Sequence, residues 1–192
     1  MKYCTECGER LEIRWHAQDL RDRLVCVSCN AIRYENPRIL IATMLTYQDR
    51  LLLCRRAEEP SSGKWNPPSG FMELGETLEQ AAARETFEEV GVKVNPSELD
   101  LYTVTSLAKI SEVYVCFRGS LTTDTFKVGR EALDVQFFSE REIPWEDLAY
   151  PEMYGFLKLF FRENATKAFG IHLSSVDAAG RYRSGYRLAP KA

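Results

Sequence analysis

Between residues 70 and 92 the chain carries a dense group of acidic side chains around a single base, Arg84. The glutamates of this segment are Glu73, Glu76, Glu79, Glu85, Glu88 and Glu89. Glu85, Glu88 and Glu89 are spaced i, i+3 and i+4, which places them on one face of a helix. Like charges at this spacing repel, so the cluster indicates either a solvated acidic surface or a bound cation. Carboxylate oxygens suit Mg²⁺ or Mn²⁺, which keep several waters and accept phosphate oxygens.

Four of the six cysteines form two C-x2-C pairs, Cys4 with Cys7 and Cys26 with Cys29. Two such pairs at this separation match the four-thiolate zinc pattern, and four thiolates leave no open position on the metal. Two disulfides would require an oxidising compartment, and a redox C-x2-C does not explain two matched pairs. The spacing therefore predicts a structural Zn²⁺ site.

The remaining cysteines and the histidines lie outside both clusters. Cys54 and Cys116 stand in apolar stretches and are expected to be buried as small hydrophobic residues. His16 and His172 are the only histidines, and neither lies near a C-x2-C pair. We expect no functional role for them.

The composition of the 192 residues is that of an ordinary globular protein, with 45% hydrophobic and 28% charged residues and a net charge of −3. The longest apolar runs are far too short for a membrane span, and the first residues lack the apolar core of a secretory signal. Residues 1–36 hold six basic and six acidic side chains, a poor surface for binding phosphates. These observations predict a cytoplasmic protein with no membrane partner and disfavour nucleic acid as a partner.

The chain divides into three expected parts, namely a zinc ribbon at 1–36, a larger domain at 37–164 and a C-terminal extension at 165–192. The extension has no sustained hydrophobic period, which predicts irregular structure. Residues 38–46 and 51–56 are expected to form a hairpin, with further strands at 101–105, 112–118 and 133–139. Helices are expected at about 77–90 and 151–163, and separated helices between strands predict an α/β fold with a sheet covered on both sides.

The first helix has clear signals at both ends. Thr77 with Gln80 three residues later is a capping box, and Gly91 suits the C-terminal cap. We expect Ala83 and Phe87, together with Val90, to bury against the sheet on the face opposite the glutamates.

The acidic segment follows one extended pattern, in which Gly70 is followed after five residues by Glu76 and after seven more by the nine residues 84–92, Arg-Glu-Thr-Phe-Glu-Glu-Val-Gly-Val. This pattern resembles the Nudix box of the Nudix hydrolases over its whole span. Residues 65–70, Trp-Asn-Pro-Pro-Ser-Gly, also look like the lead-in to that box. Two departures are Ser69, where the family often has glycine, and Thr86, where an aliphatic residue is usual.

The resemblance implies a Nudix α/β/α sandwich with a mixed sheet, preceded by the zinc ribbon. It implies a hydrolase that cleaves the diphosphate bond of a nucleoside diphosphate linked to another group. Glu85, Glu88 and Glu89 would bind the Mg²⁺ or Mn²⁺ ions, with a possible contribution from the backbone carbonyl of Ser69. Arg84 would hold a carboxylate in place. Two further catalytic candidates are Glu76, which would support the loop or a metal through water, and Glu131, which resembles a distal glutamate used as ligand or base.

A zinc ribbon before a Nudix domain is similar to the layout of pyrophosphatases that act on FAD and ADP-ribose, releasing AMP. NADH pyrophosphatases share the layout but carry a Ser-Gln-Pro-Trp-Pro-Phe-Pro stretch after the box, and residues 95–102 do not match it. An NADH pyrophosphatase, an RNA decapping hydrolase and a non-catalytic nucleotide-sensing regulator stay open as alternatives.

The expected partner is a small nucleotide. Arg55 or Arg56 is a candidate to pair with a phosphate, and Phe71 or Tyr114 to stack on a flat ring. A homodimer is consistent with the resemblance, but no residue pattern indicates one.

Overall fold

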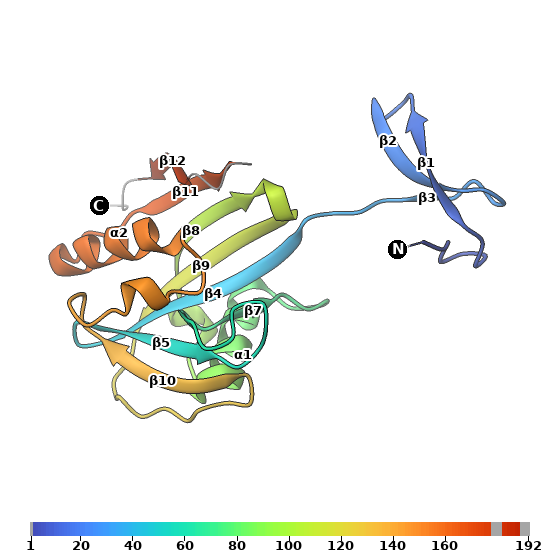
Figure 1. Ribbon diagram of the computed structural model, residues 1–192. Coiled ribbons are helices and arrows are strands. Elements are labelled where there is room, and N and C mark those ends of the chain that lie inside the picture. Colours follow the sequence, from blue (N-terminus) through green and yellow to red (C-terminus); the bar gives the residue numbers. More distant parts are fainter. Residues whose placement is uncertain (1, 178–181, 189–192) are drawn as a thin grey trace. The chain divides into compact units, whose positions relative to one another are not determined.

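A computed structural model describes residues 2–177 and 182–188 of the chain (Figure 1). The chain forms two compact units, Met1–Pro37 and Arg38–Ala192. Each unit has its own sheet and its own buried residues, so each is described by itself.

The first unit is a small antiparallel sheet in the order β1 (Leu11–His16), β2 (Arg21–Cys26) and β3 (Ile32–Arg33). Its core is minimal. Its core cluster is formed by Cys4, Leu11 and Cys26, with Leu24 and Ala31 packed against them, and Val25 is the other buried apolar residue there. So few buried side chains cannot hold a domain of this size together without a metal or another cross-link.

The second unit is built on one mixed sheet, to which nine strands contribute within the described residues. Seven of them follow the order β10-β5-β4-β9-β8-β11-β12, while β6 pairs with β5 and β7 with β4. The β4–β9 and β8–β11 pairs are parallel and the other pairs antiparallel. In chain order the strands are β4 (Arg38–Tyr47), β5 (Arg50–Arg56), β6 (Trp65–Asn66), β7 (Ser69–Phe71), β8 (Asp100–Leu107), β9 (Glu112–Ser120), β10 (Ala132–Phe138), β11 (Ile171–Val176) and β12 (Tyr182–Leu188).

Helices α1 (Leu78–Val90) and α2 (Met153–Thr166) cover opposite faces of this sheet (Figure 1). Neighbouring residues of a strand point to opposite faces. In β4, Ile41 therefore packs with the α1 side chains and Ala42 with those of α2. The expected α/β/α sandwich is confirmed. Short 3₁₀ helices lie at Pro96–Glu98, Ala108–Ile110 and Trp145–Asp147.

Helix α1 begins and ends where its sequence signals predict. The Thr77 hydroxyl accepts from the Gln80 amide, the Gln80 side chain accepts from the Thr77 amide, and Gly91 caps the C-terminus at φ 67°. This helix is the element that presents the glutamates, so its fixed start sets which of them face the sheet.

The expected buried face of α1 was partly wrong. Val90 is buried, but Phe87 is 49% exposed with the Lys93 ammonium over its ring, and Ala83 is only half-buried. Thr86 lies on the sheet side instead, fully buried, and its hydroxyl meets that of Thr43 at 2.8 Å. A polar residue thus occupies a core position because β4 supplies it with a hydrogen-bond partner.

The C-terminal extension was expected to be irregular, and over its described part this was wrong. β11 pairs with β8 in parallel, and β12 pairs with β11. The buried face of β11 includes His172, whose Nε2 lies 3.0 Å from Glu163 Oε2 of α2. A buried polar pair carries no hydrophobic period, so the strand has no signature in the sequence. None of the helices in residues 2–177 and 182–188 is long and apolar enough to cross a membrane.

Candidate functional sites

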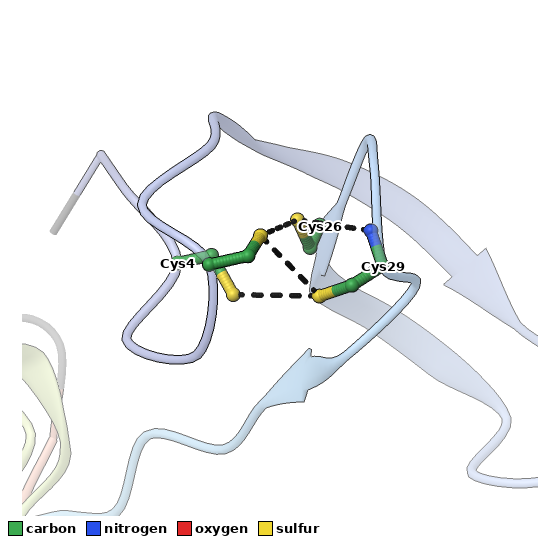
Figure 2. A group of neighbouring side chains, drawn as sticks. Cys4, Cys26 and Cys29 are labelled. Carbon is green, nitrogen blue, oxygen red and sulfur yellow. Dashed lines mark hydrogen bonds between the residues drawn. The ribbon is translucent and has the colours of Figure 1, made fainter.

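The four cysteines of the first unit converge on one point (Figure 2). Their sulfurs lie within 4.8 Å of one another, with 3.7 Å between Cys4 and Cys29 and 3.4 Å between Cys7 and Cys26. A tetrahedral ion with metal–sulfur bonds of about 2.3 Å separates its sulfurs by about 3.8 Å. The spacing of the sulfurs therefore fits one zinc ion held by four thiolates.

Backbone amides support the sulfurs. The Glu6 amide donates to Cys4 Sγ at 3.4 Å and the Cys29 amide to Cys26 Sγ at 3.5 Å. The backbone donor at Cys29 is the main cause that lowers the pKa of the Cys26 thiol to about 6. Both turns close through a residue with positive φ, Gly8 at 77° and Asn30 at 58°.

The second site lies where the short strand β7 runs against helix α1. Gly70 of β7 directly faces Glu85, and a Cβ at Gly70 would overlap the Glu85 carboxylate. Only glycine leaves room here for a buried carboxylate beside the backbone. The spacing of glycine and glutamate in the sequence thus corresponds to a direct contact in space.

Arg84 binds three of the glutamates and the backbone of β7. Its Nε and Nη2 donate to the two oxygens of Glu76 at 2.6 and 3.0 Å. Its Nη1 donates to Glu85 at 2.7 Å and to Glu88 at 3.1 Å, and Nη2 also donates to the Phe71 carbonyl at 3.0 Å. One guanidinium therefore fixes the loop of Glu76 and two carboxylates of the helix together.

The Arg84–Glu76 pair predicts a pH dependence of stability. Hydrogen bonding to Arg84 lowers the pKa of Glu76 to about 2. Because the folded-state pKa lies below that of the unfolded chain, the pair stabilises the fold above about pH 4.5 and the stabilisation is lost as pH falls toward 2. Thermal melts between pH 5 and pH 2.5 should show Glu76→Gln losing less stability than the unmodified chain. Equal losses in both proteins would contradict the pairing.

Glu89 is the most deeply placed carboxylate of the site, at 4% exposure. Its Oε2 accepts from the Ser69 amide at 2.9 Å and lies 3.2 Å from Cys54 Sγ. Burial raises the pKa of Glu89 to about 7, and burial also raises the pKa of Glu85. Arg84 bonds Glu85 but makes no hydrogen bond to Glu89, whose hydrogen-bond partners are the Ser69 amide and Cys54. A divalent cation would neutralise such buried carboxylates.

The glutamate oxygens are not gathered as the sulfurs are. Among the described residues, the four cysteines are the only histidine, cysteine, aspartate or glutamate side chains gathered closely enough to hold a metal ion as they stand. Glu85 and Glu88 turn toward Arg84, while Glu89 turns toward the amide of β7. These candidate metal ligands are all carboxylate oxygens, the hard ligands that Mg²⁺ and Mn²⁺ prefer, so their chemistry fits such an ion.

Two other charged residues approach the glutamates. The negative charge of Glu131 contributes to the raised pKa of Glu85. The positive charge of Arg56 lowers the pKa of Glu89 and so opposes the effect of burial. The Nε of Arg56 is buried and has no hydrogen-bond partner among the described residues. The guanidinium of Arg55 is instead exposed, and its Nε donates to the Gly63 carbonyl at 2.8 Å.

The two aromatic candidates occupy different environments. Phe71 is 39% exposed, with the Arg38 guanidinium 4.3 Å above its ring. Tyr114 packs against the α2 face of the core, its ring 6.0 Å from that of Phe156. The glutamates belong to α1, so the structure does not bring Tyr114 together with them.

The contact between Cys54 and Glu89 could not be anticipated from the sequence. Cys54 was expected to be a buried residue of a strand, and it is, at 1% exposure. Cys54 contacts Glu89 only because α1 packs over β5, and no local sequence pattern predicts that packing. Ser69 likewise contacts Glu89 through its backbone amide, whereas the family resemblance had indicated its carbonyl as a metal ligand.

Comparison with known proteins covers both units. Residues 36–160 match the NUDIX domain family, and residues 2–35 match the family described as Nudix N-terminal, a zinc ribbon. The crystal structure of a NUDIX hydrolase from Nitrosomonas europaea superimposes with a TM-score of 0.83 and 39% identity, covering 91% of this chain and 99% of that one.

Curated relatives are similar over part of their length. An NAD-capped RNA hydrolase NudC from Vibrio atlanticus is 29% identical over 146 residues, which is 75% of this chain and 51% of the relative. The same-named protein from Chromobacterium violaceum is 40% identical over 94 residues, covering 48% and 33%. This chain therefore spans between about a third and a half of the relatives it matches. On the match over residues 36–160, the chain belongs to the Nudix family and carries that family's N-terminal zinc ribbon.

Proposed function

We propose that this chain is a divalent-metal-dependent pyrophosphatase that cleaves the diphosphate bond of a nucleoside diphosphate linked to another group, with FAD or ADP-ribose as the preferred substrate and AMP as a product. The observation that carries the proposal is a pair of buried carboxylates, with Glu85 held beside Gly70 and Arg84, and Glu89 bonded to the Ser69 amide. Such a pair is costly for stability unless it binds a cation. Zn²⁺ in the ribbon is structural in this proposal.

The residues around the site then have separate roles. Glu85, Glu88 and Glu89 bind Mg²⁺ or Mn²⁺, and the Ser69 carbonyl is a further candidate ligand. A bound ion of this kind lowers the pKa of a coordinated water and neutralises charge on the diphosphate. Arg84 orients Glu85 and Glu88, and Glu76 orients Arg84. Glu131 serves as the fourth carboxylate, either as ligand or as the base that takes the proton of the attacking water.

Substrate contacts are proposed for Arg56 and Phe71. Arg56 has a buried Nε with no partner among the described residues, and a phosphate oxygen would satisfy it. The backbone of Phe71 borders the site, since its carbonyl accepts from Arg84, and its ring is 39% exposed. A flat ring of the substrate can stack there. Arg55 and Tyr114 are weaker candidates, since Arg55 binds the Gly63 carbonyl and Tyr114 packs in the core.

Arg56 and Arg55 form a matched pair for testing the phosphate contact. Arg56→Ala should lower kcat/KM by about 10- to 100-fold, the worth of one charge-assisted hydrogen bond. Arg55→Ala should lower it by less than about threefold, as expected for an exposed side chain. Steady-state kinetics on the best substrate measures both values. Equal effects of the two substitutions would remove Arg56 from the site.

The activity itself is tested by a hydrolysis screen with Mg²⁺ or Mn²⁺ over FAD, ADP-ribose, NADH, NAD⁺, diadenosine polyphosphates and capped RNA. The expected result is AMP released from FAD or ADP-ribose at the highest kcat/KM, with products identified by mass. Failure to turn over any of these substrates, with metal content and fold verified, would overturn the proposal and favour a nucleotide sensor.

A second candidate substrate is NAD-capped RNA, or NADH itself. The relatives named as NAD-capped RNA hydrolases favour it, although the match covers only part of their length. Residues 95–102 do not match the signature stretch of the NADH pyrophosphatases. If RNA is the substrate, its affinity should fall steeply with salt, which distinguishes it from a dinucleotide.

A further inference from the structure

The segment that joins β9 to β10 is fastened to the C-terminal end of helix α1 through the backbone. The Lys127 amide donates to the Val90 carbonyl at 2.9 Å, and the Gly129 amide donates to the Glu89 carbonyl at 2.9 Å. The last carbonyls of a helix have no partner within it, so these two bonds satisfy groups that would otherwise need water. We call residues 126–131 the strap.

The strap approaches the helix so closely that residue 129 must be small. A Cβ at Gly129 would overlap the carbonyl oxygen of Glu88 and stand 2.8 Å from that of Glu89. Both obstacles are backbone atoms of the helix, which cannot rotate away as a side chain can. Gly129 therefore has a steric reason to be glycine that does not depend on positive φ.

The strap carries Glu131, two residues after this contact. The Glu131 carbonyl accepts from the Ala57 amide at 3.0 Å, just after the end of β5. Residues 127–131 are thus held at one end by α1 and at the other by the chain that follows β5. The Glu131 side chain remains exposed, within electrostatic range of Glu85.

We propose that Gly129 is a positioning residue for the reaction, because its close contact with the end of α1 sets the distance of Glu131 from the helix glutamates. This inference rests on the proposed function. Gly129 touches neither substrate nor metal in this proposal, and it acts through Glu131.

The test is the kinetics of Gly129→Ala in the full chain. We expect kcat to fall by about tenfold or more, since a misplacement of about 1 Å at a reacting group costs up to about 10²-fold, while KM changes little. Gly155→Ala on α2 is the matched control, because a Cβ there meets nothing within 4 Å. Should the Gly155 variant lose as much activity as the Gly129 variant, the positioning role is overturned.

A double variant separates positioning of Glu131 from damage to the helix. If Gly129 acts through Glu131, the variant Gly129→Ala with Glu131→Gln should be no slower than Glu131→Gln alone. Losses that multiply would show that Gly129 acts through another residue and would overturn the inference.

Two further measurements apply, namely variants of Lys127 and the turnover of the unmodified chain. If Gly129→Ala does not fold, Lys127→Pro removes only one strap hydrogen bond, and Lys127→Ala retains it as the control. A lower kcat in the proline variant alone supports the strap, and equal values overturn it. Absence of turnover by the unmodified chain overturns the proposed function and this inference together, whereas an active chain indifferent to residue 129 overturns only the inference.

Discussion

Glu89→Gln is expected to lower kcat by about 10³-fold, because a metal ligand supplies several kcal/mol of transition-state stabilisation and each 1.36 kcal/mol corresponds to about tenfold. The amide oxygen of glutamine can still accept from the Ser69 amide, so the fold should be retained. In the metal-free protein the variant should melt no lower than the unmodified chain, since the substitution removes a buried acid whose pKa is raised to about 7. Steady-state kinetics with thermal melts measures both effects.

The control for this substitution is Glu79→Gln on the same helix. Glu79 lies in the first turn of α1, and no hydrogen bond or ion pair joins it to the proposed ligands in the described structure. It should keep full turnover. Retained activity in Glu89→Gln would remove Glu89 from the metal site and leave Arg84 as the main organiser of the cluster.

Cys4→Ser is expected to release zinc and unfold the first unit. That unit buries only a few apolar residues, and its four sulfurs lie within 4.8 Å of one another. Because the metal-bound state is the folded state in such small domains, loss of one thiolate removes much of its folding free energy. Metal analysis should show a fall from about one zinc ion per chain to a small fraction of that value.

The second unit should be unaffected by the cysteine substitution, since it has its own core. Its melting transition is therefore expected to persist in Cys4→Ser. Thr5→Ser, at an exposed neighbouring position, is the matched control and should retain zinc. Full zinc occupancy in the Cys4 variant would contradict the four-thiolate site.

The parts of the fold that were predicted correctly depend on local signals. The capping box at Thr77 and the glycine at position 91 define helix α1 within a short segment, and the apolar runs of residues 38–46 and 51–56 define β4 and β5. The cysteine pairs are equally local, because a two-residue spacing by itself brings two sulfurs to one point. Each of these features requires only neighbouring residues to be compatible.

The parts that were missed depend on contacts between distant segments. Phe87 was expected to be buried because it lies on the helix face opposite the glutamates, yet Thr86 faces the sheet and bonds the Thr43 hydroxyl, while Phe87 is exposed. Cys54 meets Glu89 and Gly129 meets Glu88 only after β5, α1 and the strap have packed together. No window of sequence contains both partners of these contacts, so no periodicity reveals them.

The pairing of β11 with β8 has a practical consequence for where this domain can be shortened. A chain cut after residue 164, the expected end of the larger domain, would lose the strand that pairs with residues 103–107 and the histidine that contacts Glu163. β8 would then become an open edge with unpaired amides and carbonyls, which invites pairing with other chains and aggregation. The C-terminus of a shortened chain must therefore lie beyond Val176, although the match to the NUDIX domain family ends at residue 160.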